Sequence, residues 1–253
     1  MLKMAFRNIF RQKRRSLLTA LTMFGGFVLT AVAIGLTDGT FNSMVNLFTR
    51  SRLGHIQVHC QGYMSRPSLN KTIANYRQIG EILDRIDGVE AWAPRVYSAG
   101  LAAVGERSAA VRIVGLDPGR ETTATRFDRK ISQGRIFSRS AAGEIILGKG
   151  LAKPLQASVG DDVVLLTQGA DGSLANERYR LIGLADSGDE ISDRTTLYLH
   201  IDDTRDLLVI GDRAHELAVV VRSLKTVAPV TMALRRELVS FPVEVQPWQE
   251  FAK

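Results

Sequence analysis

An uncharged, apolar run from Ser16 to Thr37 (SLLTALTMFGGFVLTAVAIGLT) constrains this chain more than any other feature. An α-helix rises about 1.5 Å per residue, so the run is long enough to cross the roughly 30 Å hydrocarbon core of a bilayer. Its glycines permit close helix approach, and its threonine hydroxyls can bond to carbonyls of their own helix. Residues 16–37 are therefore predicted to form one transmembrane helix.

A cleavable signal peptide is the alternative interpretation of this run. Ala31-Val32-Ala33 matches the small-residue cleavage pattern and would leave a mature protein that starts at Ile34. However, apolar character continues through Leu36, beyond that cut, and the basic segment before the run is itself patterned. These two features favour an uncleaved anchor.

The net charge of +7 is concentrated in residues 1–15, before the apolar run. A basic flank of this kind stays on the cytoplasmic side of a membrane, so the chain after residue 38 is predicted to be translocated. The rest of the chain is close to neutral, and we expect no nucleic acid partner. Six cations supply the basic flank: Lys3, Arg7, Arg11, Lys13, Arg14 and Arg15.

Residues 1–15 also carry apolar side chains at helical spacing. Leu2, Ala5, Phe6, Ile9 and Phe10 share one face of a helix, with cations beside it. We expect a cytoplasmic amphipathic helix in the membrane interface; an unstructured basic arm is the alternative. The candidate membrane-interface residues are Lys3, Phe6, Arg7, Phe10, Arg11, Arg14 and Arg15.

Residues 38–53 are predicted to continue the membrane helix outward as a stalk. Phe41, Met44, Val45 and Phe48 recur at helical spacing and would expose an apolar stripe to water. A second stalk helix is the expected partner for this stripe. The same face is a candidate substrate face, which would accept acyl chains if the substrate carries them, and plain packing between stalks is the alternative.

Two strand–helix–strand patterns follow the stalk, one near each end of the remaining chain. The first comprises a strand at 55–60, a helix at 73–86 and a strand at 89–97; the second comprises segments 216–222, 227–239 and 241–245. This order predicts an α+β, ferredoxin-like split βαβ sheet with helices on one face, formed by residues 54–117 and 214–248. A hairpin around Gly105-Glu106 is expected to lead into a turn at 115–119.

Residues 118–213 are glycine-punctuated and rich in strand patterns. We expect strands at 144–147, 162–167, 178–182 and 196–199, short helices at 149–155 and 202–208, and a turn at Asp171-Gly172. The segment is therefore predicted to be an inserted, mostly β lobe.

Catalytic and ligand-binding motifs are weak in this sequence. Gly148-Lys149-Gly150 lacks the spacing of a phosphate-binding loop. His55 and His59 share a strand face but would lie about 13 Å apart, too far for one metal ion. Cys60, the single cysteine, follows the apolar alternation and is expected to pack in the core. We predict no catalytic, cofactor or metal site, and hence no enzyme.

An acidic stretch superficially suggests a calcium-binding site. It lacks the spacing and the glycine of an EF-hand loop, so a solvated loop with turn-forming aspartates is expected instead. Its members are Asp186, Asp189, Glu190 and Asp193.

An ordered set of short motifs resembles the N-terminal half of a MacB/FtsX-type ABC transporter permease, with the lipoprotein-releasing permeases as the most similar branch. The set comprises RRSLLT before the span, GHIQVH with Gly62-Tyr63, GLDPGRE at 115–121, Gly134-Arg135, EIILGKGLAKPL at 144–155, VGDDVVL at 159–165 and LIGL at 181–184. The resemblance extends in order over essentially the whole chain.

This resemblance implies a bacterial inner-membrane protein with a porter-like periplasmic domain. It also implies an ABC ATPase partner, a second permease copy (identical or homologous), contact with membrane lipid, and a lipoprotein substrate or a periplasmic carrier or adaptor. The chain would relay ATPase-driven movement for lipoprotein release or export. The alternative is a membrane-anchored periplasmic binding or scaffold module without ATPase coupling.

The resemblance further implies three more spans, with residues 249–253 as the start of a second stalk. Three explanations for their absence from this sequence stay open: a fragment, further spans on another chain, or loss of ATPase coupling.

Overall fold

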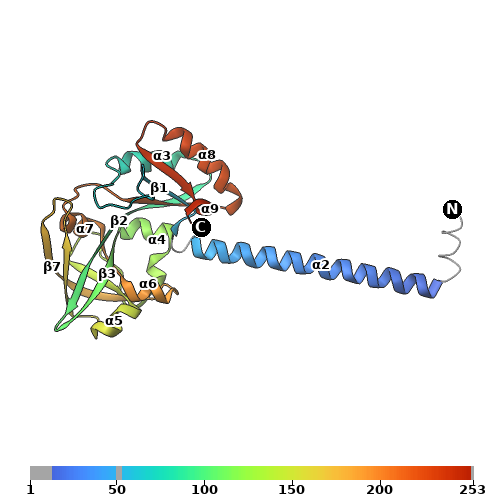
Figure 1. Ribbon diagram of the computed structural model, residues 1–253, viewed down its shortest axis with the longest axis horizontal. Coiled ribbons are helices and arrows are strands. Elements are labelled where there is room, and N and C mark those ends of the chain that lie inside the picture. Colours follow the sequence, from blue (N-terminus) through green and yellow to red (C-terminus); the bar gives the residue numbers. More distant parts are fainter. Residues whose placement is uncertain (1–12, 50–52, 252–253) are drawn as a thin grey trace. The chain divides into compact units, whose positions relative to one another are not determined.

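The computed structural model describes the backbone of residues 13–49 and 53–251, and the side chains of these residues except 37–48. The chain divides into two compact units, Met1–Leu47 and Phe48–Lys253. Figure 1 draws both units.

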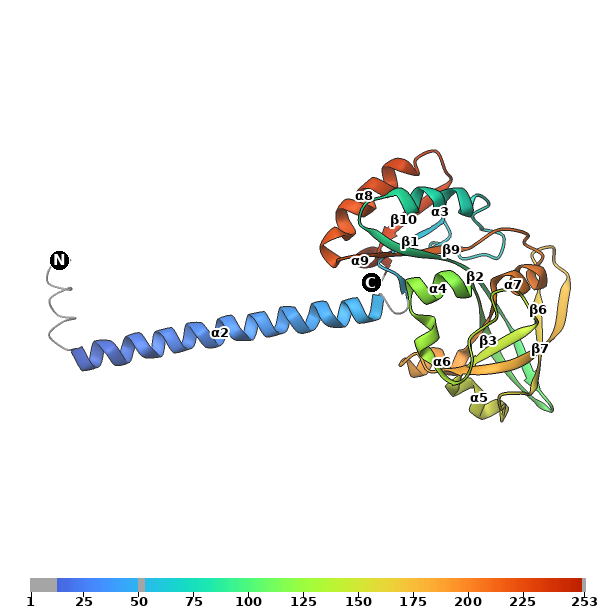
Figure 2. The same cartoon turned by 180° about the vertical axis from the view of Figure 1, so that it is seen from behind.

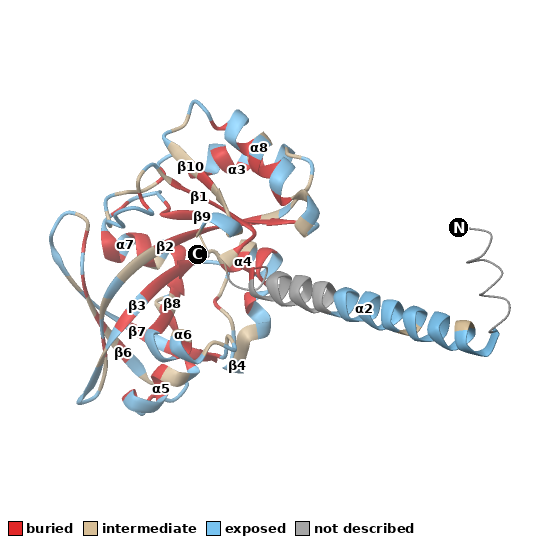
Figure 3. Cartoon of the chain, turned by 45° about the vertical axis from the view of Figure 1, so that its right-hand side comes forward, coloured by how far each residue is buried: buried red, intermediate tan, exposed pale blue. Residues whose placement is uncertain are grey.

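Helix α2 (Lys13–Phe48) dominates the first unit and contains 36 residues, about 54 Å of helix. The hydroxyls of Thr19, Thr22 and Thr30 donate to carbonyls one helical turn earlier, as the sequence predicted. The segment Lys13–Leu36 is long and apolar enough to cross a membrane, and its most apolar window is 0% buried. Figure 3 colours most of the Lys13–Leu36 segment pale blue, for exposed residues.

The second unit consists of strands alternating with short helices. In chain order they are β1 (Ile56–Cys60), α3 (Tyr76–Arg85), β2 (Val89–Val104), β3 (Arg107–Leu116), α4 (Pro118–Ala124), η2 (Phe127–Lys130), β4 (Ile131–Gly134), β5 (Glu144–Gly148), α5 (Lys149–Leu155), β6 (Asp162–Gln168), β7 (Leu174–Ala185), α6 (Glu190–Thr195), β8 (Thr196–His200), α7 (Ile201–Leu208), β9 (Glu216–Val221), η3 (Leu224–Thr226), α8 (Val227–Glu237), β10 (Val243–Pro247) and α9 (Trp248–Phe251).

The two predicted strand–helix–strand patterns combine into one antiparallel sheet in the order β10-β1-β9-β2. Helices α3 and α8 lie together on one face of this sheet (Figures 1 and 2). Ile79 and Leu83 of α3 and Leu234 of α8 are fully buried there against the strands. This arrangement confirms the predicted ferredoxin-like fold class. Cys60 is half-buried and lies at the margin of the same core.

Strand β2 continues without a break from this sheet into the β-rich lobe. Residues 89–95 pair with β9, whereas residues 95–104 pair with β3. The sequence had suggested an interruption between 97 and 100. Gly100 lies in that interval, and a Cβ there would come within 2.5 Å of the Leu166 carbonyl oxygen on β6. Glycine therefore permits close strand approach here rather than ending the strand.

Six strands of the lobe close into a ring in the order β2-β3-β8-β5-β7-β6, because β6 pairs with both β7 and β2. Alternate residues point into the ring, including Ile113, Ile145 and Leu197, and helix α5 contributes Leu151 and Leu155 to the same core. The predicted helix at 149–155 is present as α5.

The hairpin of β2 and β3 contributes to the core of the lobe. Ala102, Val111 and Ile113 are buried in the cluster that fills the ring. The sequence predicts these residues to belong to the first part of the domain, up to residue 117. We propose instead that the lobe begins near Tyr97, where β2 leaves β9. Both parts belong to one compact unit.

Two segments expected to be turns or loops form helices. Asp117 caps the N-terminus of α4 by accepting a hydrogen bond from the Arg120 amide, and Pro118 begins the helix, so 115–119 is a strand end followed by a helix start. In the acidic stretch, Asp189 caps α6. Asp193 is buried and accepts hydrogen bonds from the Ser187 amide and hydroxyl, so the prediction of a wholly solvated loop was wrong.

Candidate functional site

A buried ion cluster (Arg95, Glu121 and Glu216) lies where β2 passes from one part of the sheet to the other. Arg95 Nε donates to Glu121 Oε1 at 2.5 Å and Nη2 donates to Glu121 Oε2 at 3.2 Å. Arg95 Nη1 donates to Glu216 Oε1 at 3.2 Å. All three residues are at most 6% exposed. The cluster connects β2, α4 and β9.

Local sequence explains how α4 presents Glu121. The Asp117 cap and Pro118 start the helix, and Glu121 lies one turn later on its buried side. Burial raises the pKa of Glu121, but the charge of Arg95 and hydrogen bonds from Arg95 and Thr125 outweigh it, so the pKa lies below its usual value. Thr125 Oγ1 donates to Glu121 Oε2 at 2.5 Å. Glu121 is therefore held ionised inside the domain.

The polar contacts continue from Glu216 to two histidines. His59 Nε2 lies 3.6 Å from Glu216 Oε2, and the His59 ring stacks on Tyr63 with centroids 5.0 Å apart. His215 Nδ1 accepts a hydrogen bond from the Tyr97 amide, and its Nε2 lies 3.0 Å from the Leu69 carbonyl oxygen. Burial raises the pKa of Tyr63 to about 12, so its hydroxyl stays neutral.

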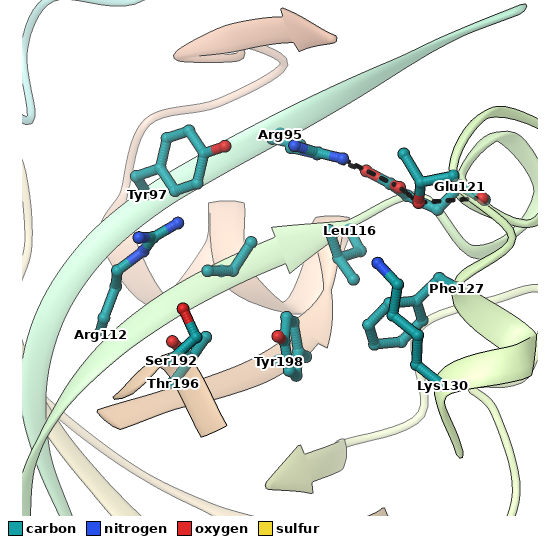
Figure 4. Close-up of a pocket in the computed structure, with 12 residues that line it drawn as sticks. Arg95, Tyr97, Arg112, Leu116, Glu121, Phe127, Lys130, Ser192, Thr196 and Tyr198 are labelled. Atoms are coloured by element: carbon teal, nitrogen blue, oxygen red, sulfur yellow. Dashed lines mark hydrogen bonds and ion pairs between the residues drawn. The ribbon is translucent and has the colours of Figure 1, made fainter. Parts of the chain in front are cut away.

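A cavity, here called the junction cavity, adjoins the buried ion cluster (Figure 4). It has room of about 40 Å³ for the centres of water-sized groups, enough for about three waters. Strands β2, β3 and β8 and helices α4, η2 and α6 supply its walls. The lining consists of Arg95, Tyr97, Arg112, Val114, Leu116, Glu121, Thr125, Phe127, Lys130, Ser192, Thr196 and Tyr198.

Two cation–aromatic pairs lie in the lining of the junction cavity. The Arg112 guanidinium lies 5.2 Å from the centroid of the Tyr97 ring, and Lys130 Nζ lies 5.6 Å from that of Phe127. Burial raises the pKa of Tyr97 far above its usual value, so this phenol is also neutral. Chemically, the cavity offers positive charge and hydroxyl groups to a small ligand.

The structure describes only some of the candidate residues that the sequence suggests. Lys3, Phe6, Arg7, Phe10 and Arg11 lie outside the described residues, whereas Arg14 and Arg15 are exposed in the first turn of α2. The backbone at Phe41, Met44, Val45 and Phe48 is helical, within α2, but their side chains lie outside the described residues. Their roles stay predictions.

Sequence reasoning missed the ion cluster and the junction cavity. Arg95 and Glu216 each stand in or beside an apolar strand run, AWAPRV and ELAVVV, and a charge in such a run signals a buried partner. This pattern indicates that Arg95 and Glu216 are paired, but it does not identify the residues with which they pair. Among the described residues, no group of three or more His, Cys, Asp or Glu side chains is placed to hold a metal ion.

Comparison with known proteins places residues 16–237 in a family. Residues 16–237 match the family described as MacB-like periplasmic core domain. The chain is 25% identical over 254 aligned positions to "Lipoprotein-releasing system transmembrane protein LolC" of Neisseria meningitidis serogroup B. That alignment includes 96% of this chain and 59% of the relative, so the chain spans well under two thirds of the relative's length.

Solved structures show the same fold at low sequence identity. The periplasmic region of MacB from Actinobacillus actinomycetemcomitans matches with a TM-score of 0.55 and 15% identity, covering 78% of this chain and 91% of that one. The extracellular domain of the noncanonic ABC-type transporter YknZ from Gram-positive bacteria matches with a TM-score of 0.53 and 14% identity, covering 76% and 98%. The chain thus belongs to the family of MacB-like periplasmic core domains, the domain of MacB-like ABC transporter permeases related to LolC.

Proposed function

We propose that this chain acts as a permease subunit of an ABC transport system and relays ATPase-driven movement to the periplasm for lipoprotein release or export. Family membership and the similarity to LolC, whose name states lipoprotein release, support the proposal. In it, α2 spans the bacterial inner membrane with the basic N-terminus in the cytoplasm. The second unit then lies in the periplasm and carries no ATPase chemistry of its own.

The observation that carries this proposal is that the first and last strands of the second unit lie side by side. Strands β1 and β10 are antiparallel neighbours, with Ile56 opposite Pro247. The Trp248 amide donates to the His55 carbonyl oxygen at 2.9 Å. Helices attached before β1 and after β10 would therefore act on one edge of the sheet. The α9 residues Trp248–Phe251 would begin the second stalk.

The construction of the second unit suits a body that transmits movement without deforming. Strand β2 is shared by both parts, and the buried ion cluster ties β2 to α4 and β9. Separating the two parts would take Glu121 on α4 away from Arg95 on β2 and leave a buried carboxylate without its cation, which is strongly unfavourable. Displacement at the edge formed by β1 and β10 should therefore reach the lobe.

The proposed partners follow from the same model of action. An ABC ATPase supplies the energy, and a second permease copy, identical or homologous, pairs with the stalk through Phe41, Met44, Val45 and Phe48. Membrane lipid surrounds α2, whose described apolar side chains are exposed. The substrate is a lipoprotein, handed to a periplasmic carrier or adaptor.

Purification of the native protein from its own membranes tests the partnership. We expect an ABC ATPase and a second permease chain to co-purify and to be identified by mass spectrometry. Purification without an ATPase would reject the proposal and favour the membrane-anchored scaffold module.

A linker insertion tests the mechanical role. Six Gly/Ser residues inserted between Phe48 and Thr49 should leave ATPase co-purification intact but abolish release of lipoprotein from spheroplasts. The matched control carries the same insertion after Glu106, in the exposed turn between β2 and β3, and should retain release. Undiminished release by the first variant would contradict mechanical coupling.

A further inference from the structure

The junction cavity combines features that a hydrophobic core does not require. We propose that it binds a phosphate group, with Arg112 and Lys130 supplying charge and hydroxyls of Ser192, Thr196 and Tyr198 supplying hydrogen bonds. This inference does not depend on the transport function proposed above.

The charges around the cavity leave a positive excess. Arg95 is offset by two carboxylates, Glu121 and Glu216, at hydrogen-bonding distance. Arg112 is exposed over the Tyr97 ring, and among the described residues no carboxylate is placed to form an ion pair with it. Together with Lys130, the five ionised groups carry a net charge of +1. The cavity therefore attracts an anion.

Glu121 is the acidic residue in the lining, and it does not fill the place of that anion. Its two oxygens accept hydrogen bonds from Arg95 and Thr125. Figure 4 shows Glu121 turned toward Arg95, with Arg112 and Lys130 at opposite sides of the cavity. An anion between these two cations would therefore not compete with Glu121 for the Arg95 guanidinium.

The size and the hydroxyl content favour phosphate over a carboxylate. The room of about 40 Å³ corresponds to about three water-sized oxygens, the number of terminal oxygens of a phosphate monoester. An arginine fork and a lysine point charge are the usual protein partners of phosphate. Three hydroxyl-bearing side chains add donors that a planar carboxylate with two oxygens would use less fully.

The phosphate group can come from two sources, free inorganic phosphate or a phospholipid headgroup. The experiment uses the full chain in a neutral detergent and a phosphate-free buffer. Isothermal titration calorimetry is performed with inorganic phosphate and, separately, with dihexanoylphosphatidic acid, a phosphate monoester, below its micellar concentration. We expect saturable 1:1 binding of at least one probe that weakens with added salt.

Charge variants locate the binding. R112Q and K130Q should each weaken binding at least about tenfold, because each removes a charge-assisted hydrogen bond to the anion. R107Q is the matched control, with the same change of charge on the same strand; Arg107 is exposed and about 17 Å along β3 from Arg112. R107Q should bind as the unaltered chain does. Thermal unfolding of each variant checks that the domain is folded.

Each outcome bears on the proposal. Tighter binding of the lipid probe assigns the site to a headgroup, and equal or tighter binding of inorganic phosphate assigns it to the free anion; both support the site if R112Q and K130Q weaken it. Absence of saturable binding by either probe overturns the proposal. Equal weakening by R107Q and R112Q also overturns it, because the attraction would then be diffuse.

Discussion

The indole ring of Trp92 occupies the space where a side chain on Gly80 would lie. A Cβ at Gly80 of α3 would come within 2.0 Å of Trp92 Cζ2 on β2. On other sides, Trp92 Nε1 donates to Asp84 Oδ1 at 2.7 Å and the Arg120 guanidinium lies 3.6 Å from the ring centroid. Trp92 thus connects α3, β2 and α4, and the absence of a side chain at Gly80 permits it.

Replacement of Gly80 by alanine should destabilise the second unit. The added methyl group displaces a buried ring, and overpacking of this kind costs about 1–3 kcal/mol despite the better helix propensity of alanine. Urea unfolding of the full chain in detergent, followed by tryptophan fluorescence, measures the effect. G119A in α4 is the control, because its Cβ would meet only the Asp117 carboxylate at an ordinary 3.4 Å. Similar stability of G80A and G119A would contradict the assignment.

Removal of the Arg95 side chain should cost more than removal of an exposed ion-pair partner. R95A leaves Glu121 and Glu216 buried without their cation, which typically costs about 3–5 kcal/mol. R77A removes a partner of Asp212, but Arg77 is 69% exposed, so a loss below about 1 kcal/mol is expected. Urea midpoints of the two variants give the comparison. Equal losses would show that the buried ion cluster contributes no more to stability than an exposed ion pair.

Stability of the second unit should fall as pH is lowered below about 6.5. Burial lowers the pKa of His215 below its ordinary 6.5, so the unfolded chain binds a proton that the folded chain excludes. The contribution of His215 to the free energy of unfolding is complete above pH 6.5. Below that pH it declines by at most about 1.4 kcal/mol per pH unit, the limit for a single titrating group.

The measurement for His215 is the free energy of unfolding between pH 7.5 and 5. H215Q should flatten the decline, because glutamine keeps an acceptor for the Tyr97 amide and a donor for the Leu69 carbonyl without titrating. Glu121, whose pKa is lowered by Arg95, stabilises the folded state at all pH values above 4.5 and loses this contribution only below 4.5, outside this window. An unchanged slope in H215Q would assign the pH dependence to other groups.

A charge in the middle of α2 should impair membrane insertion. Phe24 is 67% exposed within the apolar segment, and arginine at the centre of a span costs about 2.5–3.5 kcal/mol. F24R should shift the protein from the carbonate-resistant membrane fraction toward the soluble fraction. L174R, at the 75% exposed Leu174 of the second unit, is the control and should remain in the membrane. Full carbonate resistance of F24R would argue against a span centred there.

Elements with a local periodic signature could be predicted from the sequence alone. The apolar run predicted α2, and the two strand–helix–strand patterns predicted the ferredoxin-like sheet with α3 and α8 on one face. These predictions succeeded because each element buries or exposes side chains at a fixed period, and a short stretch of sequence is enough to reveal that period. Asp117 and Asp189 are N-cap residues of α4 and α6. Aspartate is also common in turns, so the sequence predicted turns there and did not predict these two helices.

The candidate site, by contrast, was decided by tertiary structure. Arg95 meets Glu121 from 26 positions away and Glu216 from 121 positions away, and no local period specifies such partners. The continuity of β2 through Gly100 likewise depends on the approach of β6, a strand far along the chain. A charged residue in a buried strand indicates that an oppositely charged partner exists, because burying an unpaired charge costs too much free energy. Only the closure of the sheet determines which residue that partner is, and which cations are left to line the junction cavity.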